Sequence, residues 1–311
     1  MHAHTPPAAA IPADGALPGL VPAPGGSHAA HGSGVHAARP ARTITPRSPD
    51  LGFDAVPRYW MARSALATQV SNGVNLLFPA GERFFVRSVR HYLDQLDDDA
   101  LRAQVKGFFG QEGRHARAHE RQFEALRAQG YDVDGFLAFY EPLLARIEAM
   151  APAELRLSVT VALEHYTAIM AHGALTDPQL AAAMHPAMAR LLKWHAAEEI
   201  EHKSVAFDVL AAVNPSYRLR LAGMGVATLG LAAFWIGSTS YLLLQDQRAG
   251  RSLRGHDVAV MQTRERSIVR DVFAAGLRAY LRRDFHPNEV DDYALAAQFL
   301  AESGIDEPTA A

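Results

Sequence analysis

The sequence contains no cysteine, and its net charge is close to zero. None of its 311 residues is Cys, which excludes disulfides, thiolate metal sites and cysteine nucleophiles. The formal net charge of −3 lacks the basic excess that nucleic-acid binding requires, so we expect no nucleic-acid partner. No G-x-S-x-G segment occurs either, so a serine nucleophile of the α/β-hydrolase type has no support in the sequence.

The first 50 residues lack helical or strand periodicity. They hold nine of the 18 prolines, six glycines and many alanines. A segment of this composition cannot bury enough apolar surface to offset the entropy lost on ordering, so we predict a disordered tail over residues 1–52. The tail also lacks the basic start and the continuous apolar stretch of a secretory signal, and we therefore expect a cytoplasmic protein.

Strand-like alternation is absent from about residue 57 onward, and helix-forming residues dominate. The pattern predicts an all-α fold, with a helical bundle over residues 55–215 and a helical extension over residues 216–304. The expected helices cover residues 63–96, 97–130, 133–149, 153–175, 186–213, 258–283 and 287–302. Pro79 and Gly81 predict a break in the first helix just before Glu82.

A pattern of glutamate and histidine occurs twice within these helices. A single Glu is followed 30 residues later by Glu-x-x-His in the first half and 35 residues later in the second half. The residues are Glu82, Glu112, His115, Glu164, Glu199 and His202. One Glu on each of two helices and Glu-x-x-His on each of two others is the ligand pattern of a four-helix bundle that holds two metal ions.

The apolar periodicity of the helices places these residues on inward faces. Glu82 shares its stripe with Phe78 and Phe85, and Glu199 and His202 share theirs with Val209. Because unpaired buried carboxylates are very costly, four of them together require cations. We predict two metal ions: iron suits these oxygen and nitrogen ligands, manganese is an alternative, and only the geometry of the site would exclude zinc.

Four further residues lie close in sequence to the predicted ligands, and three of them are candidates for the metal site. His119 and His195 lie on the same stripes, as extra ligands or as partners that orient the carboxylates, and the orienting role is favoured. Glu198 is a competing candidate beside Glu199, although only Glu199 stands three residues before His202. We expect Glu201 to point to solvent.

One segment of the extension carries no charge over 24 residues, from Leu221 to Leu244. It is long enough to cross a bilayer, but its glycines and hydroxyl side chains would make insertion only marginally favourable. Either contact with a membrane or burial against the bundle or a partner chain is consistent with this composition.

Four stretches of the sequence resemble a bacterial family of predicted metal-dependent hydrolases. They are FPAGERFF around Glu82, QEGRHARAHE with Glu112 and His115, ALEHY at Glu164, and WHAAEEIEHKSVAFDV with Glu199 and His202. The FHP sequence at residues 285–287 also fits. The same order of ligands is similar to that of ferritin-like di-iron carboxylate proteins, and this similarity implies a bundle with two carboxylate-bridged irons.

Three functions are compatible with such a centre. The first expectation is a di-iron oxidoreductase that activates O₂ and acts on a small hydrophobic organic substrate. The alternative is a hydrolase in which a two-metal site activates water. The third hypothesis is a helical module that binds metal without catalysing a reaction.

Overall fold

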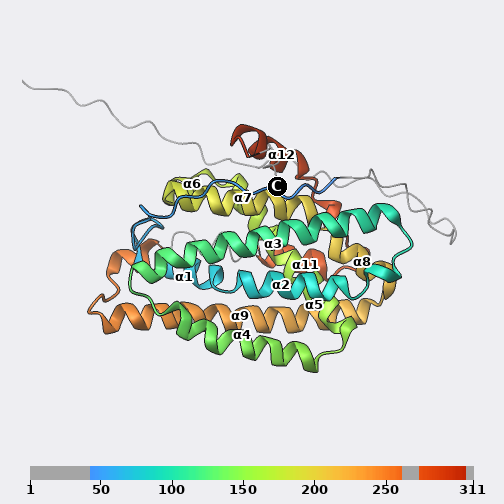
Figure 1. Cartoon of the computed structure of the whole chain (residues 1–311), viewed down its shortest axis with the longest axis horizontal. Coiled ribbons are helices and arrows are strands. Elements are labelled where there is room, and N and C mark those ends of the chain that lie inside the picture. Colours follow the sequence, from blue (N-terminus) through green and yellow to red (C-terminus); the bar gives the residue numbers. More distant parts are fainter. Residues whose placement is uncertain (1–42, 261–272, 306–311) are drawn as a thin grey trace, which may run out of the picture. The chain divides into compact units, whose positions relative to one another are not determined.

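The computed structural model describes residues 43–260 and 273–305, and every regular element in these ranges is a helix (Figure 1). The prediction of an all-α fold is confirmed. The α-helices are α1 (Ala65–Asn75), α2 (Phe78–Arg90), α3 (Asp99–Ala128), α4 (Val133–Met150), α5 (Ala153–Thr176), α6 (Pro178–Ala183), α7 (Pro186–His202), α8 (Val205–Val213), α9 (Tyr217–Arg248), α11 (Ala275–Tyr280) and α12 (Tyr293–Glu302). Two short 3₁₀ helices, η1 (Leu93–Gln95) and η3 (Pro287–Glu289), and a helical stretch at residues 255–260 are also present.

Four helices form the bundle that carries the predicted ligands. Helix α2 packs against α3 and α5, and α7 packs against the same two helices. The single glutamates lie on α2 and α5, and the two Glu-x-x-His pairs lie on α3 and α7. The inward faces of all four helices therefore meet in one interior, as a four-helix bundle with a two-metal core requires.

The first predicted helix is broken where its proline indicates. Helix α1 ends at Asn75, and α2 begins at Phe78 with Pro79 in its first turn, where the missing backbone N–H costs no helical hydrogen bond. This break before Glu82 confirms the prediction.

The single helix predicted over residues 186–213 is wrong, because α7 ends at His202 and α8 starts at Val205. Between them, the buried Lys203 ammonium group donates to Asp292 Oδ1 and to the carbonyl oxygen of Val290, each at 2.5 Å. These partners lie almost 90 residues after Lys203 in the chain, so local periodicity does not indicate the break.

Residues 43–52 differ from the expectation of a disordered tail. Ile44, Arg47 and Leu51 are buried, with 7%, 7% and 2% of their surface exposed. A Cβ at Gly107 of α3 would lie 2.5 Å from the Ile44 carbonyl oxygen, so only glycine allows this close approach. A segment without internal periodicity is thus ordered by its contacts with the bundle. Residues 1–42 lie outside the described part of the chain.

The apolar segment predicted at residues 221–244 lies within α9, which packs along α5 and α1. A Cβ at Gly223 would lie 2.1 Å from Ser158 Oγ, so glycine at this position allows the close approach of α9 to α5. The helix predicted over residues 258–283 falls partly outside the described residues, and α11 lies near its end. The helix predicted over residues 287–302 is divided in two: Pro287–Glu289 form the 3₁₀ helix η3, and α12 begins at Tyr293.

Candidate metal centre

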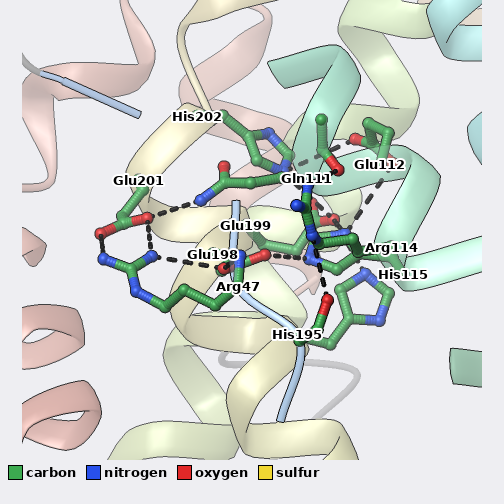
Figure 2. A network of polar contacts seen from close by, with 12 residues as sticks. Arg47, Gln111, Glu112, Arg114, His115, His195, Glu198, Glu199, Glu201 and His202 are labelled. Atoms are coloured by element: carbon green, nitrogen blue, oxygen red, sulfur yellow. Dashed lines mark hydrogen bonds and ion pairs between the residues drawn. The ribbon is translucent and has the colours of Figure 1, made fainter. Parts of the chain in front are cut away.

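Glu112 and His115 of α3 meet Glu199 and His202 of α7 in the bundle interior (Figure 2). Each residue contributes one donor atom to a set in which all atoms lie within 4.8 Å of one another. Glu112 Oε1 lies 3.5 Å from His202 Nε2, and Glu199 Oε1 lies 3.7 Å from His115 Nδ1 and 3.6 Å from His202 Nε2. Ligands bound to one ion at about 2.1 Å lie roughly 3–3.4 Å apart, so small adjustments would let these atoms share a metal ion.

The donor atoms of Glu112, His115 and His202 lack hydrogen-bond partners among the described residues. Both carboxylate oxygens of Glu112, Nδ1 of His115 and Nε2 of His202 are buried without one. Because buried polar atoms are otherwise nearly always paired, this set of four unpaired atoms fits a metal ion.

Glu82 of α2, His119 of α3 and His195 of α7 form a second group of the same kind. His195 Nε2 lies 3.7 Å from Glu82 Oε1, and the rings of His119 and His195 are joined by a 2.8 Å contact between Nε2 and Nδ1. Neither oxygen of Glu82 has a hydrogen-bond partner among the described residues. The two histidines for which the sequence favoured an orienting role thus lie where a second metal ion would need ligands.

Glu199 joins the two groups. Its Oε1 atom, which faces His115 and His202, also accepts a 2.9 Å hydrogen bond from His195 Nε2. Thr167 of α5 donates a hydrogen bond to the other oxygen, Oε2, and this fixes the orientation of the carboxylate. A carboxylate that faces both groups is the arrangement expected for two ions bridged by one glutamate.

Burial and mutual charge dominate the electrostatics of the centre. Burial, followed by the charges of nearby carboxylates, raises the pKa of Glu112 and of Glu82 well above the usual range. Burial would also raise the pKa of Glu199, but the imidazoles of His202 and His195 outweigh it and hold that pKa at about 2. Glu199 thus has imidazole partners that favour its charged form, whereas the charges of Glu112 and Glu82 are opposed by neighbouring carboxylates.

Glu164 takes a different position from the one expected for a ligand. Its Oε2 atom lies 3.1 Å from His202 Nδ1, on the side of the imidazole opposite to Glu112 and Glu199. In this arrangement Glu164 accepts a hydrogen bond from the Nδ1–H group and leaves Nε2 free for a metal ion. Its other oxygen, Oε1, is buried without a partner among the described residues.

Glu198 has the corresponding role for His115. Its Oε2 atom lies 2.9 Å from His115 Nε2, so the imidazole directs Nδ1 toward Glu112 and Glu199. Glu198 also receives the Arg47 backbone N–H at 3.0 Å and its guanidinium at 3.3 Å. The contacts form a continuous chain from residue 47 to His115 (Figure 2).

Arg47, Gln111 and Thr167 are polar residues of this site that the sequence did not indicate. The expectation that Glu201 points to solvent is wrong: its oxygens accept hydrogen bonds from Arg47 at 2.7 and 3.0 Å and from Gln111 Nε2 at 2.6 Å (Figure 2). Arg47 lies in the proline-rich segment, where no periodicity marks an inward-facing position.

Aromatic rings pack against the imidazoles. Phe108 lies 4.9 Å from His202, Trp194 lies 5.0 Å from His115, and Phe78 lies 4.6 Å from His119, all between ring centroids. These rings limit access of bulk water to the donors and strengthen electrostatic interactions within the centre.

Buried carboxylates and imidazoles on four helices define the class of helical bundle proteins whose core can hold two metal ions. The family model described as "Predicted metal-dependent hydrolase" matches residues 45–291. The chain therefore belongs to this family, and the matched range contains every residue of the two donor groups. Neither the comparison with curated proteins nor the comparison with solved structures gave a match.

Proposed function

We propose that this protein is a metal-dependent hydrolase with a dinuclear centre in its helical bundle. The observation that supports the proposal is the position of Glu199, whose Oε1 atom faces donor atoms of both groups. One ion would be held by Glu112, His115, Glu199 and His202, and the other by Glu82, His119 and His195. We assign Glu164 and Glu198 to orienting His202 and His115, although Glu164 stays a candidate ligand through its unpaired oxygen.

Two bound ions would lower the pKa of a coordinated water and so supply a nucleophile near neutral pH. The protein's own groups prepare the site for this chemistry. Glu198 and Glu164 each accept a hydrogen bond from the ring N–H that faces away from the ion, and this fixes the tautomer of the imidazole. The donor set of nitrogen and oxygen without sulfur suits iron, manganese or zinc.

A second candidate is the O₂-activating di-iron oxidoreductase that the sequence favoured. The observation that favours it is burial: His195 is 4% exposed and Glu199 3%, and the other donors are at most 1% exposed. An ester or phosphate substrate would need an opening toward the ions, whereas O₂ is small and apolar enough to pass between packed side chains. Family membership favours hydrolysis, and we therefore place hydrolysis first.

The first experiment compares the metal content of the purified wild-type protein with that of the Glu112→Ala, Glu199→Ala double variant. We expect about two ions per chain in the wild type and almost none in the variant. Glu124→Ala is the matched control, because this glutamate lies on the same helix as Glu112 with 73% of its side chain exposed. Equal metal content in the wild type and the double variant would end the proposal.

The second experiment tests the reaction. The protein loaded with Mn²⁺, Zn²⁺ or Fe²⁺ is assayed with aryl esters and aryl phosphates, and the Fe²⁺ form is also mixed rapidly with O₂. Hydrolysis that the double variant lacks supports the first candidate. Rapid O₂ consumption with a transient visible absorption, and no hydrolysis, would replace it with the second. Metal binding without either reaction would support the third hypothesis, a metal-binding module without catalysis.

A further inference from the structure

Helix α9 presents an outward face without charge. Exposed positions recur at helical spacing along its central part, and Leu229 and Ile236 have 74% and 67% of their surface exposed. The uncharged run of 24 residues corresponds to about 36 Å of helix. Helices on the surface of a soluble domain usually present charged residues to water. An uncharged exposed face therefore indicates contact with a lipid layer or with an apolar protein surface.

Helix α4 extends the same face. It lies beside α9, where Tyr140 and Phe234 pack at 5.0 Å between ring centroids and Tyr241 donates a hydrogen bond to Asp132 (Figure 1). Of the 11 large apolar side chains exposed in the described part of the chain, seven lie on these two helices. We call them the apolar face: Phe139, Ile147, Met150, Val226, Leu229, Ile236 and Leu244.

Arginines lie at the edges of the apolar face and within it. Arg218 and Arg248 are exposed at the two ends of α9, and Arg146 is exposed on α4, two turns after Phe139 on the same side of that helix. None of the three forms an ion pair with a residue in the described ranges. A surface that combines exposed apolar side chains with cations is complementary to anionic lipid headgroups above a hydrocarbon layer.

The same charges disfavour a second copy of the chain as the occupant. If two α9 helices packed antiparallel, Arg218 of each would meet Arg248 of the other, and in a parallel arrangement each arginine would meet its own equivalent. Like charges at both ends oppose either pairing.

The packing of α9 against its neighbours indicates whether this helix lies on a membrane surface or spans the bilayer. By length and composition α9 can cross a bilayer, yet its other face is packed along α5 and α1. A crossing helix would take its neighbours into the hydrocarbon, including α5 with the buried Glu164 and the ion-paired Asp246 near its own end. Those groups are too costly in lipid, so contact in the membrane plane is the compatible arrangement.

We propose that the apolar face of α4 and α9 binds the surface of an anionic phospholipid bilayer, with the axis of α9 parallel to the membrane. Side chains such as Leu229 and Phe139 enter the boundary between headgroups and acyl chains, and the three arginines contact lipid phosphates. This inference does not depend on the metal centre or on its reaction.

Flotation of the full-length protein with vesicles tests the proposal. One set of vesicles consists of phosphatidylcholine and the other of phosphatidylcholine with phosphatidylglycerol. The wild type is expected to float with the anionic vesicles, and binding to weaken as salt is added. Leu229→Glu, Ile236→Glu should abolish flotation. Leu281→Glu, Val290→Glu is the matched control, because these side chains are 46% and 54% exposed outside the apolar face.

A second variant separates the charge from the apolar contribution. Arg218→Gln, Arg248→Gln is expected to weaken binding to anionic vesicles on the order of tenfold or more, without changing the helical circular dichroism spectrum. Wild-type protein that stays unbound to both vesicle types overturns the proposal, as does equal flotation of Leu229→Glu, Ile236→Glu. A wild-type dimer that this variant makes monomeric, without vesicle binding, would assign the face to a second copy instead.

Discussion

Replacing Glu112 with glutamine is expected to stabilise the metal-free protein and to remove its stabilisation by metal. Glu112 is fully buried, and neither of its oxygens has a hydrogen-bond partner among the described residues. Burial and the carboxylates of Glu164, Glu199 and Glu82 raise its pKa well above the usual range. Glutamine keeps the shape of the side chain but carries no charge, so the repulsion and most of the desolvation cost disappear.

The sign and size of this effect depend on pH. Because the pKa of Glu112 is higher in the folded than in the unfolded protein, the folded state holds an extra proton. The free energy of unfolding then falls as pH rises above the unfolded pKa, by about 1.4 kcal/mol per pH unit for each extra proton. Glutamine removes this dependence. Its advantage should therefore grow with pH and reach about 1–4 kcal/mol, the range found when buried ionic groups are replaced by neutral side chains of similar volume.

Thermal unfolding followed by circular dichroism measures both effects, at about pH 6 and about pH 8.5. With chelator at the higher pH, we expect the melting temperature of Glu112→Gln to exceed that of the wild type by several degrees, at about 2–4 °C per kcal/mol. Metal at about 100 times its Kd should stabilise the wild type by about 2.7 kcal/mol and the variant hardly at all. The control Glu124→Gln, on the exposed side of α3, should change stability by less than about 0.5 kcal/mol.

Two results would refute this reasoning. A Glu112→Gln protein that is less stable than the wild type in chelator at the higher pH would mean that the carboxylate has a favourable partner in the fold. Equal stabilisation of both proteins by metal would mean that the ions bind elsewhere.

Three further predictions concern the bridging carboxylate, the arginine contact and the packing of α9. Glu199→Ala should remove both metal ions while Glu82→Ala removes one, as measured by elemental analysis of the purified proteins, and loss of the same number from both would contradict the assigned bridge. Arg47→Ala should weaken metal affinity about 10–100-fold in chelator competition, with Arg47→Lys intermediate, whereas unchanged affinity would show that its contact with Glu198 is not needed. Gly223→Ala should destabilise the protein by several kcal/mol in denaturant unfolding, because the new methyl group meets the backbone of α5 at 2.5 Å. Gly230→Ala on the same helix meets nothing within 4 Å and should instead stabilise by up to about 1 kcal/mol.

The helices that carry the donor groups were predictable because their signals are local. A residue and its neighbour three positions later share a helix face, so Glu112 with His115 and Glu199 with His202 were placed together without any knowledge of the fold. The break before Glu82 follows from the proline beside it. The type of element and the position of these side chains on it therefore depend on a few neighbouring residues.

The parts that could not be predicted depend on partners far along the chain. Arg47 contacts residues more than 150 positions away, and the break at Lys203 is stabilised by partners almost 90 positions away. The second donor group could be predicted only in part, for the same reason. His119 and His195 were placed on the correct helix faces, but the side-chain conformations that bring them beside Glu82 come from packing between three helices.

The contact of Arg47 with Glu198 has a consequence for how the protein is made. The two residues are 151 positions apart, so the segment around Arg47 is synthesised earlier and must wait for α7 before it can dock. Until α7 is made, Glu198 is absent, and His115 lacks the carboxylate that fixes its orientation. Metal acquisition is therefore expected late in maturation, after synthesis of α7. A substitution that removes the Arg47 contact would therefore affect the metal content of the finished protein even where the helices fold normally.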